Sequence, residues 1–468
     1  MSGPVVPFDD GVQALMDRAM DRVAGGRPIP GNRVELLFDG PAVYPAMLER
    51  IGAASHWIHL DNYIIRDDAT GRRMMAALTD RARSGVRVRV LTDWFGSWTT
   101  RRRLWEPLRA AGGEVRHFQP PDFLRPFANL TRDHRKLLVA DGCLGVTGGL
   151  CIGDEWAGDP AANRQPWRDT GIAVDGPAAA VLDRAFAAVW NHIGAPLPED
   201  ELAADVAALG HAAVRVVAGE PGGVRGSRTT ELLLAGAAER VWLTDAYLVA
   251  PRGIYRALLD AAREGVDVRL LVPGTSDLPH VRNLTRTGYR ELLRSGVRIY
   301  EWRGPMLHAK TIVVDGRWSR IGSTNMNLSS LIANYELDVL VDDQDLARQL
   351  EAQFRRDLDR SAEVTIRRNR FRSSLTFRPP EASIPVHVRG MRERRRRSVV
   401  TLRAVLGGSQ RALLTQGSLV VTALAALLFF FPRTMGVTFG LLTLYFFLTS
   451  VAGVARSDGR TGGPAGGQ

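Results

Sequence analysis

Hydrophobic and polar residues follow two alternating periods along most of the chain. Short apolar runs, which are typical of buried strands, are separated by amphipathic stretches with the 3.6-residue period of a helix. In the first part of the chain this pattern predicts strands at 33–38, 57–64, 86–92 and 115–118, and helices at 41–54, 70–84 and 101–111. Strands and helices that alternate in this way indicate an α/β fold.

The same order of elements returns after about residue 214. The pattern there predicts helices at 229–238, 251–263 and 281–295, and strands at 241–245, 266–272 and 297–301. Short stretches of sequence repeat as well, since Asp61-Asn62-Tyr63-Ile64 is matched by Asp245-Ala246-Tyr247-Leu248. A single repetition indicates one duplicated fold rather than a solenoid. We therefore predict a first α/β domain at 33–198 and a second at 211–362, joined through a proline-containing stretch near 195–211.

The N-terminal segment 1–32 contains one predicted amphipathic helix. Apolar residues recur at helical spacing between 9 and 24, and Gly25-Gly26 ends the pattern. We expect this helix to pack on the first domain; contact with a membrane surface is the alternative.

The C-terminal part of the chain differs in composition from both domains. Residues 363–411 form a basic connector, which we do not expect to join a packed domain. Two uncharged apolar runs follow at 412–431 and 435–454, and each is about as long as a membrane-spanning helix. The pattern predicts a transmembrane hairpin at 412–454 and a flexible tail at 455–468, with a buried or a re-entrant helix pair as alternatives.

Charge indicates the kind of partner and the orientation of this hairpin. The 468 residues carry a net charge of +11, which indicates an anionic partner, either nucleic acid or an acidic membrane surface. Arginines gather on the outer flanks of the hairpin, so both flanks are expected in the cytoplasm. We expect a protein of the cell (inner) membrane with its folded domains on the cytoplasmic side. The two cysteines do not form a disulfide framework, and the N-terminus has no secretory signal pattern.

Two copies of the pattern H-x-K-x-x-x-x-D contain the only two lysines of the chain. The residues concerned are His134, Lys136 and Asp141 in the first domain, and His308, Lys310 and Asp315 in the second. Residues i and i+2 of a strand face the same side, so each motif is expected to present one imidazole and one ammonium together. We predict these six residues to be catalytic.

A turn of small residues follows each motif. These turns contain Gly148, Gly149 and Cys151 in the first domain, and Gly322, Ser323 and Asn325 in the second. We expect them to expose backbone N–H groups that bind phosphate oxygens. Two histidines, two lysines and two such turns suit a phosphodiester: one His attacks phosphorus, the other protonates the leaving alcohol, and both lysines neutralise the oxygens. No metal and no cofactor are expected, because no typical set of metal ligands is present.

These motifs resemble those of the phospholipase D superfamily, the "HKD" enzymes, and in particular those of bacterial cardiolipin synthases. The similarity lies in His134 to Asp141, Thr147 to Trp156, Trp167-Arg-Asp169, Leu307 to Lys310, Gly322 to Asn327 and Asn334-Tyr-Glu336. The resemblance covers roughly residues 33–362 and implies two duplicated α/β sandwich domains that share one active site. It also implies a phosphohistidine intermediate on His134, a substrate-binding role for Glu336, and transfer of a phosphatidyl group between two phosphatidylglycerol molecules or to another phospholipid.

The chain departs from the family pattern at Cys151, where family members usually have asparagine, and in the position of its apolar hairpin after the domains. Anionic phospholipids and the bacterial membrane are the expected partners, nucleic acid is not, and the sequence does not define the oligomeric state. Two other functions stay open: a phospholipase D or nuclease-type hydrolase using the same covalent step, and an inactive membrane scaffold.

Overall fold

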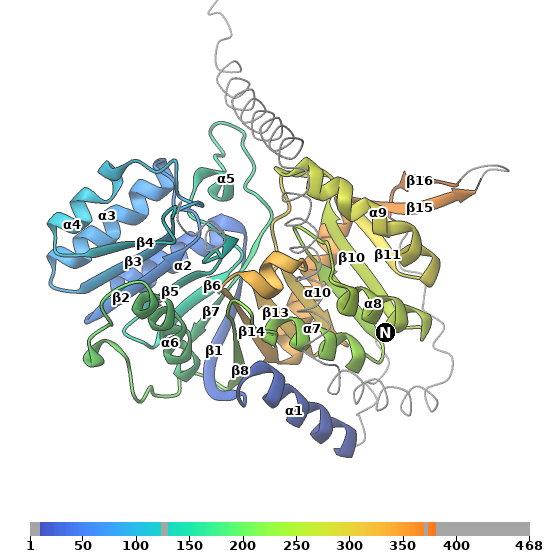
Figure 1. The fold of residues 1–468 in the computed structure, drawn as a ribbon, viewed down its shortest axis with the longest axis horizontal. Coiled ribbons are helices and arrows are strands. Elements are labelled where there is room, and N and C mark those ends of the chain that lie inside the picture. The colour runs from blue at the N-terminus through green and yellow to red at the C-terminus, as the bar shows by residue number, and fades with distance from the viewer. Residues whose placement is uncertain (1–9, 123–129, 369–372, 381–468) are drawn as a thin grey trace, which may run out of the picture. The chain divides into compact units, whose positions relative to one another are not determined.

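The computed structural model describes residues 10–122, 130–368 and 373–380 of the chain. They form a 16-stranded sheet that consists of two half-sheets with helices on both faces (Figure 1). The strands of the first half are β1 (Ile29–Phe38), β2 (Trp57–Asn62), β3 (Arg87–Asp93), β4 (Glu114–Phe118), β5 (Lys136–Ala140), β6 (Leu144–Gly148) and β7 (Thr170–Asp175). Its helices are α2 (Asp39–Ala53), α3 (Ala69–Arg83), α4 (Glu106–Ala110), α5 (Asp154–Ala157) and α6 (Pro177–His192).

The second half repeats these elements. Its strands are β8 (Ala212–Gly219), β9 (Arg240–Thr244), β10 (Asp267–Pro273), β11 (Arg298–Trp302), β12 (Thr311–Val314), β13 (Trp318–Gly322) and β14 (Glu336–Asp342), followed by β15 (Ser361–Arg368) and β16 (Ser373–Arg378). Its helices are α7 (Arg225–Gly236), α8 (Arg252–Arg263), α9 (Pro279–Ser295) and α10 (Gln344–Asp359).

Strand order confirms the predicted duplication. The first half runs β1-β7-β6-β5-β2-β3-β4, and the second runs β8-β14-β13-β12-β9-β10-β11 before β15 and β16 extend it. The first strand of each half pairs antiparallel with the other, which joins the two half-sheets at β1 and β8. The equivalent edges of both halves therefore meet along the join.

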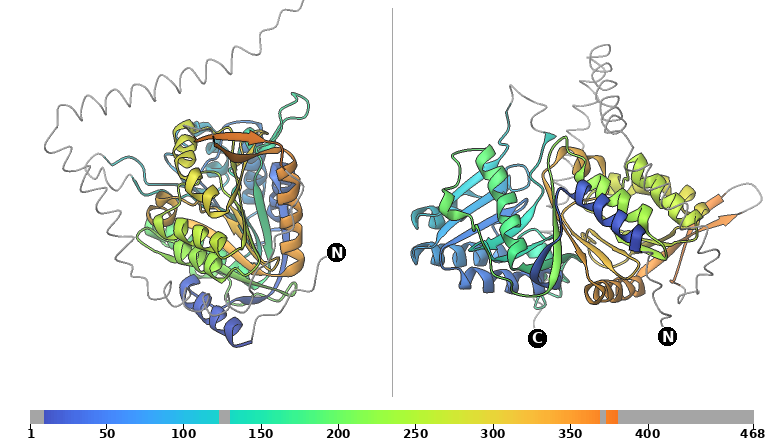
Figure 2. Two further views of the ribbon diagram at one scale, coloured as in Figure 1. Left: turned by 90° about the vertical axis from the view of Figure 1, so that its right-hand side faces the viewer. Right: turned by 90° about the horizontal axis from the view of Figure 1, so that it is seen from below.

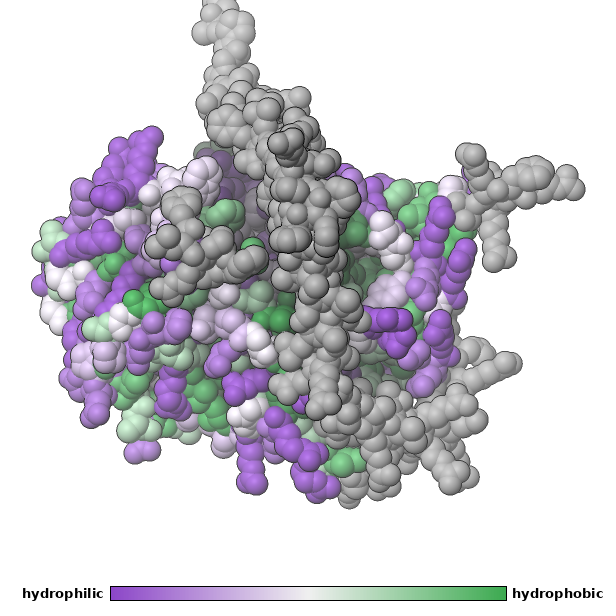
Figure 3. All heavy atoms as spheres, in the orientation of Figure 1, coloured by the Kyte–Doolittle hydropathy of each residue, from purple (hydrophilic) through white to green (hydrophobic). Residues whose placement is uncertain are grey.

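Three apolar cores lie between the sheet and its helices. One contains Met47 of α2 and Leu78 of α3 on one face of the first half-sheet, and another contains Leu232 of α7 and Leu258 of α8 on the corresponding face of the second. The third is shared, because Phe186 of α6 and Phe354 of α10 belong to the same cluster. Figure 2 shows these layers from two further sides. The described surface seen in Figure 3 mixes hydrophilic side chains with smaller hydrophobic areas.

The N-terminal helix lies elsewhere than expected. Helix α1 (Asp10–Ala24) packs on the second half, not on the first: Ala19, Met20 and Val23 belong to the core around α7 and α8. Asp21 also forms an ion pair with Arg215 of β8, with 2.5 Å between Oδ1 and Nη2. The prediction was wrong because periodicity shows which face of a helix is apolar but not which surface receives it.

The basic connector begins with ordered structure, which also corrects the prediction. Residues 361–368 form β15 and residues 373–378 form β16, and β15 pairs antiparallel with β11 at the outer edge of the second half. Val364 is buried there, and Glu363 binds Arg298 at 2.9 Å. The prediction was based on the many arginines of this stretch, and it did not take into account that apolar residues alternate with polar ones there.

Other differences concern single elements. The helix predicted at 101–111 is a 3-10 turn at Arg102–Leu104 followed by the short α4. Four further elements, α6, α10, β7 and β14, were not predicted from the sequence pattern. Within residues 10–122, 130–368 and 373–380, no helix has both the length and the apolar character needed to cross a membrane. The predicted hairpin at 412–454 and the tail at 455–468 lie outside the described residues.

Candidate active site

Both motif histidines lie directly before a central strand rather than within it. β5 begins at Lys136, whose backbone pairs with Asn62 of β2, and β12 begins at Thr311, one residue after Lys310. His134 and His308 therefore precede the strands, which corrects the strand geometry expected from the sequence. Each lysine ammonium donates a hydrogen bond to the backbone carbonyl of the histidine two residues before it.

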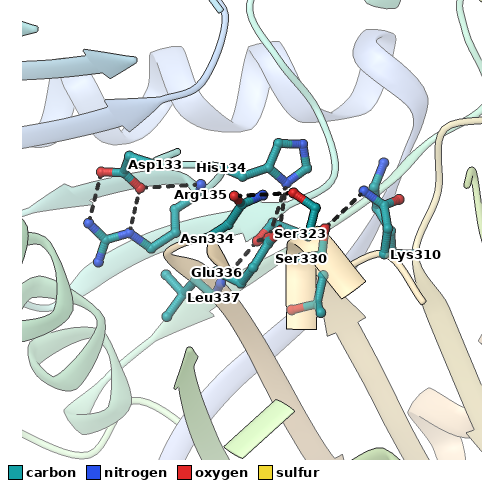
Figure 4. Close-up of polar contacts among 12 residues, drawn as sticks. Asp133, His134, Arg135, Lys310, Ser323, Ser330, Asn334, Glu336 and Leu337 are labelled. Atoms are coloured by element: carbon teal, nitrogen blue, oxygen red, sulfur yellow. Dashed lines mark hydrogen bonds and ion pairs between the residues drawn. The ribbon is translucent and has the colours of Figure 1, made fainter. Parts of the chain in front are cut away.

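His134 of the first half contacts a carboxylate of the second half (Figure 4). Its Nδ1 atom lies 3.0 Å and 3.1 Å from the two carboxylate oxygens of Glu336, at the start of β14. Its backbone N–H donates to the carbonyl of Tyr335 at 3.0 Å. The Ser323 hydroxyl donates to the Glu336 carboxylate at 2.5 Å, which fixes that carboxylate in turn.

His308 of the second half makes the reciprocal contact with the first half. Its Nδ1 atom lies 2.7 Å from Oδ2 of Asp169, directly before β7, and its backbone N–H donates to the Arg168 carbonyl at 2.7 Å. Each half thus supplies a histidine to the other half's carboxylate. An ionised carboxylate can only accept hydrogen bonds, so each imidazole carries hydrogen on Nδ1 when its carboxylate is ionised, and Nε2 then faces the chemistry.

The segment before His134 is fixed by a buried ionic network. The Asp133 carboxylate accepts from Arg135 Nε at 2.9 Å, and the Asp133 backbone N–H donates to Asp93 at 3.0 Å. All three side chains are buried. A buried and fully paired network of this kind limits the movement of the backbone that carries His134.

The electrostatics of the two histidines differ. Burial, followed by the charges of Lys136 and Lys310, lowers the pKa of His134 well below its ordinary value. Burial and Lys310 also lower the pKa of His308, but Asp169 opposes that shift. The pKa of Asp169 is lowered overall by His308 and Lys310, although burial acts in the opposite direction. His134 is therefore held neutral, while His308 has a partner that stabilises its protonated form.

Two further groups of the site titrate near neutral pH. Burial raises the pKa of Glu336 to about 7, against the opposing charge of Lys136. Burial lowers the pKa of Lys310 to about 8, with Lys136 acting in the same direction and Asp169 opposing it. Buried groups with shifted pKa values around one centre are typical of a catalytic site.

Aromatic rings surround both histidines. The ring of Tyr63 lies 4.9 Å from that of His134 between centroids, and its equivalent Tyr247 lies 6.0 Å from His308. Trp156 and Trp167 lie 5.7 Å and 6.0 Å from His308. These rings limit the access of water to the imidazoles.

The two motif aspartates are not at this centre. Asp141 follows the far end of β5, where its carboxylate accepts from the backbone N–H groups of Ser55, His56 and Trp57. Asp315 follows β12 and accepts in the same way from Ala238, Glu239 and Arg240. Both close a turn at the edge of the sheet opposite the histidines, so their contacts are structural.

The glycine turns also act differently from the prediction. The N–H groups of Gly149, Gly322 and Ser323 already donate to the carbonyls of Thr170, Lys310 and Leu337, so they are not free to receive phosphate. A Cβ atom at Gly149 would lie 2.1 Å from Oδ1 of Asp169, and one at Gly322 would lie 2.1 Å from Oδ1 of Asp338. Gly148 is part of β6, and a Cβ atom there would lie 2.6 Å from the Cα atom of Gly171 on β7. Gly149 and Gly322 therefore make room for carboxylates, and Gly148 makes room for the neighbouring backbone.

Cys151 and Asn325 occupy equivalent positions, each 17 residues after its motif histidine. Both are buried. Burial raises the pKa of Cys151, and the charges of Lys136 and Lys310 act in the opposite direction. The Asn325 carbonyl oxygen has no hydrogen-bond partner among the described residues, and its amide lies 3.5 Å from the Ser330 hydroxyl.

Sequence reasoning missed Asp169 as a site residue and assigned Glu336 to substrate binding. The structure makes the two carboxylates equivalent, since they begin or precede the equivalent strands β7 and β14. The internal repeat was the signal that could have paired them. Among the described residues, no group of three or more His, Cys, Asp or Glu side chains is arranged to hold a metal ion.

Two His-x-Lys segments brought together between two copies of one α/β half define a phospholipase D-like protein. The family model described as "Cardiolipin synthase, PLD-like domain" matches residues 47–156 and 232–358, which include both segments. The chain belongs to this family of phospholipase D-like cardiolipin synthases.

Curated relatives support the same family. The chain is 33% identical to a cardiolipin synthase of Halalkalibacterium halodurans, over 78% of this chain and 73% of the relative. It is 35% identical to cardiolipin synthase A of Pseudomonas aeruginosa, over 74% of this chain and 71% of the relative.

Solved structures share the fold at low sequence identity. Phosphatidylserine synthase of Haemophilus influenzae matches with a TM-score of 0.58 and 14% identity, over 74% of this chain and 91% of that structure. Polyphosphate kinase of Porphyromonas gingivalis matches with a TM-score of 0.52 and 14% identity, over 87% of this chain and 56% of that structure.

Proposed function

We propose that this protein is a cardiolipin synthase-type phosphatidyltransferase that joins two phosphatidylglycerol molecules and releases glycerol. The observation that carries the proposal is the crossed arrangement of His134 with Glu336 and of His308 with Asp169. It supplies two oriented imidazoles and two lysines in one buried centre, as transfer between two alcohols requires. The curated relatives named above give the substrate class.

In the first step, Nε2 of His134 attacks the phosphorus of the first phosphatidylglycerol. A P–N bond forms, the P–O bond to the glycerol headgroup breaks, and His308 gives its Nε2 proton to the leaving glycerol oxygen. The neutral state of His134 supplies the lone pair for attack, and Asp169 stabilises His308 while it carries the proton. Lys136 and Lys310 offset the negative charge on the phosphoryl oxygens.

In the second step, the glycerol headgroup of another phosphatidylglycerol is the acceptor. His308 removes a proton from its hydroxyl group, the oxygen attacks phosphorus, and the P–N bond breaks. Cardiolipin is released and His134 is regenerated as a neutral imidazole. Glu336 holds His134 in one orientation through both steps, so we assign it to positioning rather than to substrate binding.

The same covalent intermediate allows hydrolysis if water replaces the second alcohol. The buried position of His308 and the rings of Tyr63, Trp156 and Trp167 favour transfer, because they limit water at phosphorus. Mass analysis of lipids made by the purified protein from phosphatidylglycerol, with and without phosphatidylethanolamine, separates the two outcomes. Cardiolipin with an equal amount of glycerol supports the proposal, and phosphatidic acid as the main product contradicts it.

The membrane context belongs to the same proposal and rests on sequence alone. The apolar runs at 412–431 and 435–454 would form the hairpin, with the arginine-rich flanks and the folded domains on the cytoplasmic side of the inner membrane. An impermeant thiol reagent applied to intact cells should label a cysteine introduced at Thr434 but not one introduced at Arg395. Labelling with the reverse pattern would contradict this orientation.

A further inference from the structure

Large hydrophobic side chains that remain exposed are few among the described residues, and most lie at one edge of the sheet. Eight such side chains are exposed: Phe95, Trp98, Leu130, Leu209, Leu278, Leu284, Leu328 and Phe377. Trp98 and Leu130 have exposed fractions of 67% and 64%. Single exposed apolar residues need no explanation, but a group of them around a site indicates a contact surface.

In the first half, these side chains follow the strand ends that carry the active site. β3 runs parallel to β2, and the end of β2 at Asn62 pairs with Lys136 at the start of β5. Phe95 and Trp98 follow the end of β3 directly, and Leu130 lies four residues before His134. All three therefore lie at the edge of the sheet where His134 lies.

In the second half, segments at the same edge of the sheet carry the other members. Leu278 lies between β10 and α9, and Leu284 lies in the second turn of α9. Leu328 lies in the connection between β13 and β14, which also contains Asn325. Leu284 lines an apolar cavity of about 160 Å³ between α8 and α9, so the apolar surface continues inward there.

The two remaining exposed side chains lie elsewhere. Leu209 precedes β8, whose other end at Gly219 pairs with Glu336, so Leu209 is at the edge opposite the active site. Phe377 is on the outermost strand, β16. Six of the eight exposed hydrophobic side chains thus lie at the edge of the sheet that carries the active site, and both halves contribute to this group.

Positive charge accompanies these apolar side chains. Arg101, Arg102 and Arg103 follow Trp98 and are all exposed, and Arg252 is exposed at the start of α8. The Asp67 carboxylate near this loop is paired with Arg103 at 3.1 Å and with Arg72 at 2.8 Å. Aromatic and aliphatic side chains next to arginines suit the interface of a bilayer with anionic headgroups.

We propose that Phe95, Trp98, Leu130, Leu278, Leu284 and Leu328 form an apolar rim that inserts into an anionic phospholipid bilayer. The rim surrounds the shared site on both sides, so insertion would open the site into the headgroup layer. This inference rests on the proposed function for its choice of lipid as the partner. It adds a contact surface within the folded domains, separate from the hairpin predicted at 412–454.

The first test measures the depth of single positions with full-length protein reconstituted in phosphatidylglycerol vesicles. An environment-sensitive fluorophore is attached at Trp98→Cys, at Leu328→Cys and, as the matched control, at Leu209→Cys, each in a Cys143→Ser background; Cys151 is buried. Brominated acyl chains should quench the first two labels and leave the third unchanged. Equal quenching at all three positions, or none at 98 and 328, overturns the proposal. The proposal is also overturned if, without vesicles, the fluorescence of the first two labels shifts towards that of an apolar environment as the protein concentration rises. That result would mean that a second copy of the protein covers the rim.

The second test compares turnover on two forms of phosphatidylglycerol. The double variant Phe95→Ser/Trp98→Ser should lose about tenfold or more on vesicles, since it removes two apolar groups from the contact, and should keep its turnover on detergent-dispersed lipid. Leu209→Ser should change neither. Unchanged turnover of the double variant on vesicles contradicts the rim. If the wild-type protein is inactive on both forms of the lipid, the proposed function is contradicted instead. The fluorescence test of the rim does not depend on turnover, so its result remains valid in that case.

Discussion

The Nδ1 atom of His134 lies 3.0 Å from a carboxylate oxygen of Glu336, a residue 202 positions later in the chain. The reciprocal contact joins His308 to Asp169 across 139 positions. Each of the two motif histidines thus pairs with a carboxylate of the other half. The duplication therefore gives one active site rather than two.

Replacing Glu336 with glutamine should lower kcat by about 10²–10⁴-fold, because the amide can no longer select the Nδ1–H form of His134. Asp169→Asn should act in the same way on His308. Asp342→Asn is the matched control, since Asp342 ends the same strand and pairs with Arg317 instead. Steady-state kinetics should show a change mainly in kcat for both site variants, with an unchanged melting temperature. A loss confined to KM would assign Glu336 to substrate binding.

Activity should depend on pH in a bell shape. Glu336, with a pKa of about 7, accepts from His134 best when ionised, so kcat/KM should rise as pH increases through 7. Lys310, with a pKa of about 8, is charged only below that value, so kcat/KM should fall above it. Glu336→Gln should remove the acid limb from its residual activity. A profile that is flat between about pH 6 and pH 9 would contradict both assignments.

Much of this arrangement could be predicted from the sequence, and the limits have physical causes. Periodicity predicted the duplicated α/β fold, and the two lysines marked the motifs, because both signals are local. The partner of His134 could not be predicted in this way, since 202 residues separate it from Glu336. The pairing of β1 with β8 and the core shared by α6 and α10 bring the two halves together, and neither is a local signal. Asp141 was assigned to catalysis because spacing does not show that a strand separates it from His134.

Lys136→Arg and Lys310→Arg should each be severely impaired although the charge is kept. Both lysines are buried, and a planar guanidinium cannot occupy the place of a compact ammonium. Turnover of phosphatidylglycerol by each variant measures the effect. Arg102→Lys is the control, because it exchanges the same two residue types at an exposed position outside the active site and should leave turnover unchanged. Two arginine variants with normal turnover would show that the ammonium groups do not contact the phosphoryl oxygens.

Cys151→Asn should be tolerated and should raise the rate. The amide is a stronger donor than the thiol, and Asn325 already occupies the equivalent position of the second half. The converse variant, Asn325→Cys, should lower turnover. Comparison of kcat for the two variants measures the effect. A large loss in Cys151→Asn would mean that this buried position accepts only the smaller thiol.

The covalent intermediate offers the most direct test of the shared site. The enzyme is mixed with radiolabelled phosphatidylglycerol, quenched within one turnover under alkaline conditions that preserve phosphohistidine, and mapped by peptide analysis. We expect label on His134 in the wild-type protein. We expect no label in His134→Ala, because His308 transfers protons in this mechanism and does not attack phosphorus. Label on His308 would reverse the two roles. Label on both histidines at once would contradict a single site shared by the two halves.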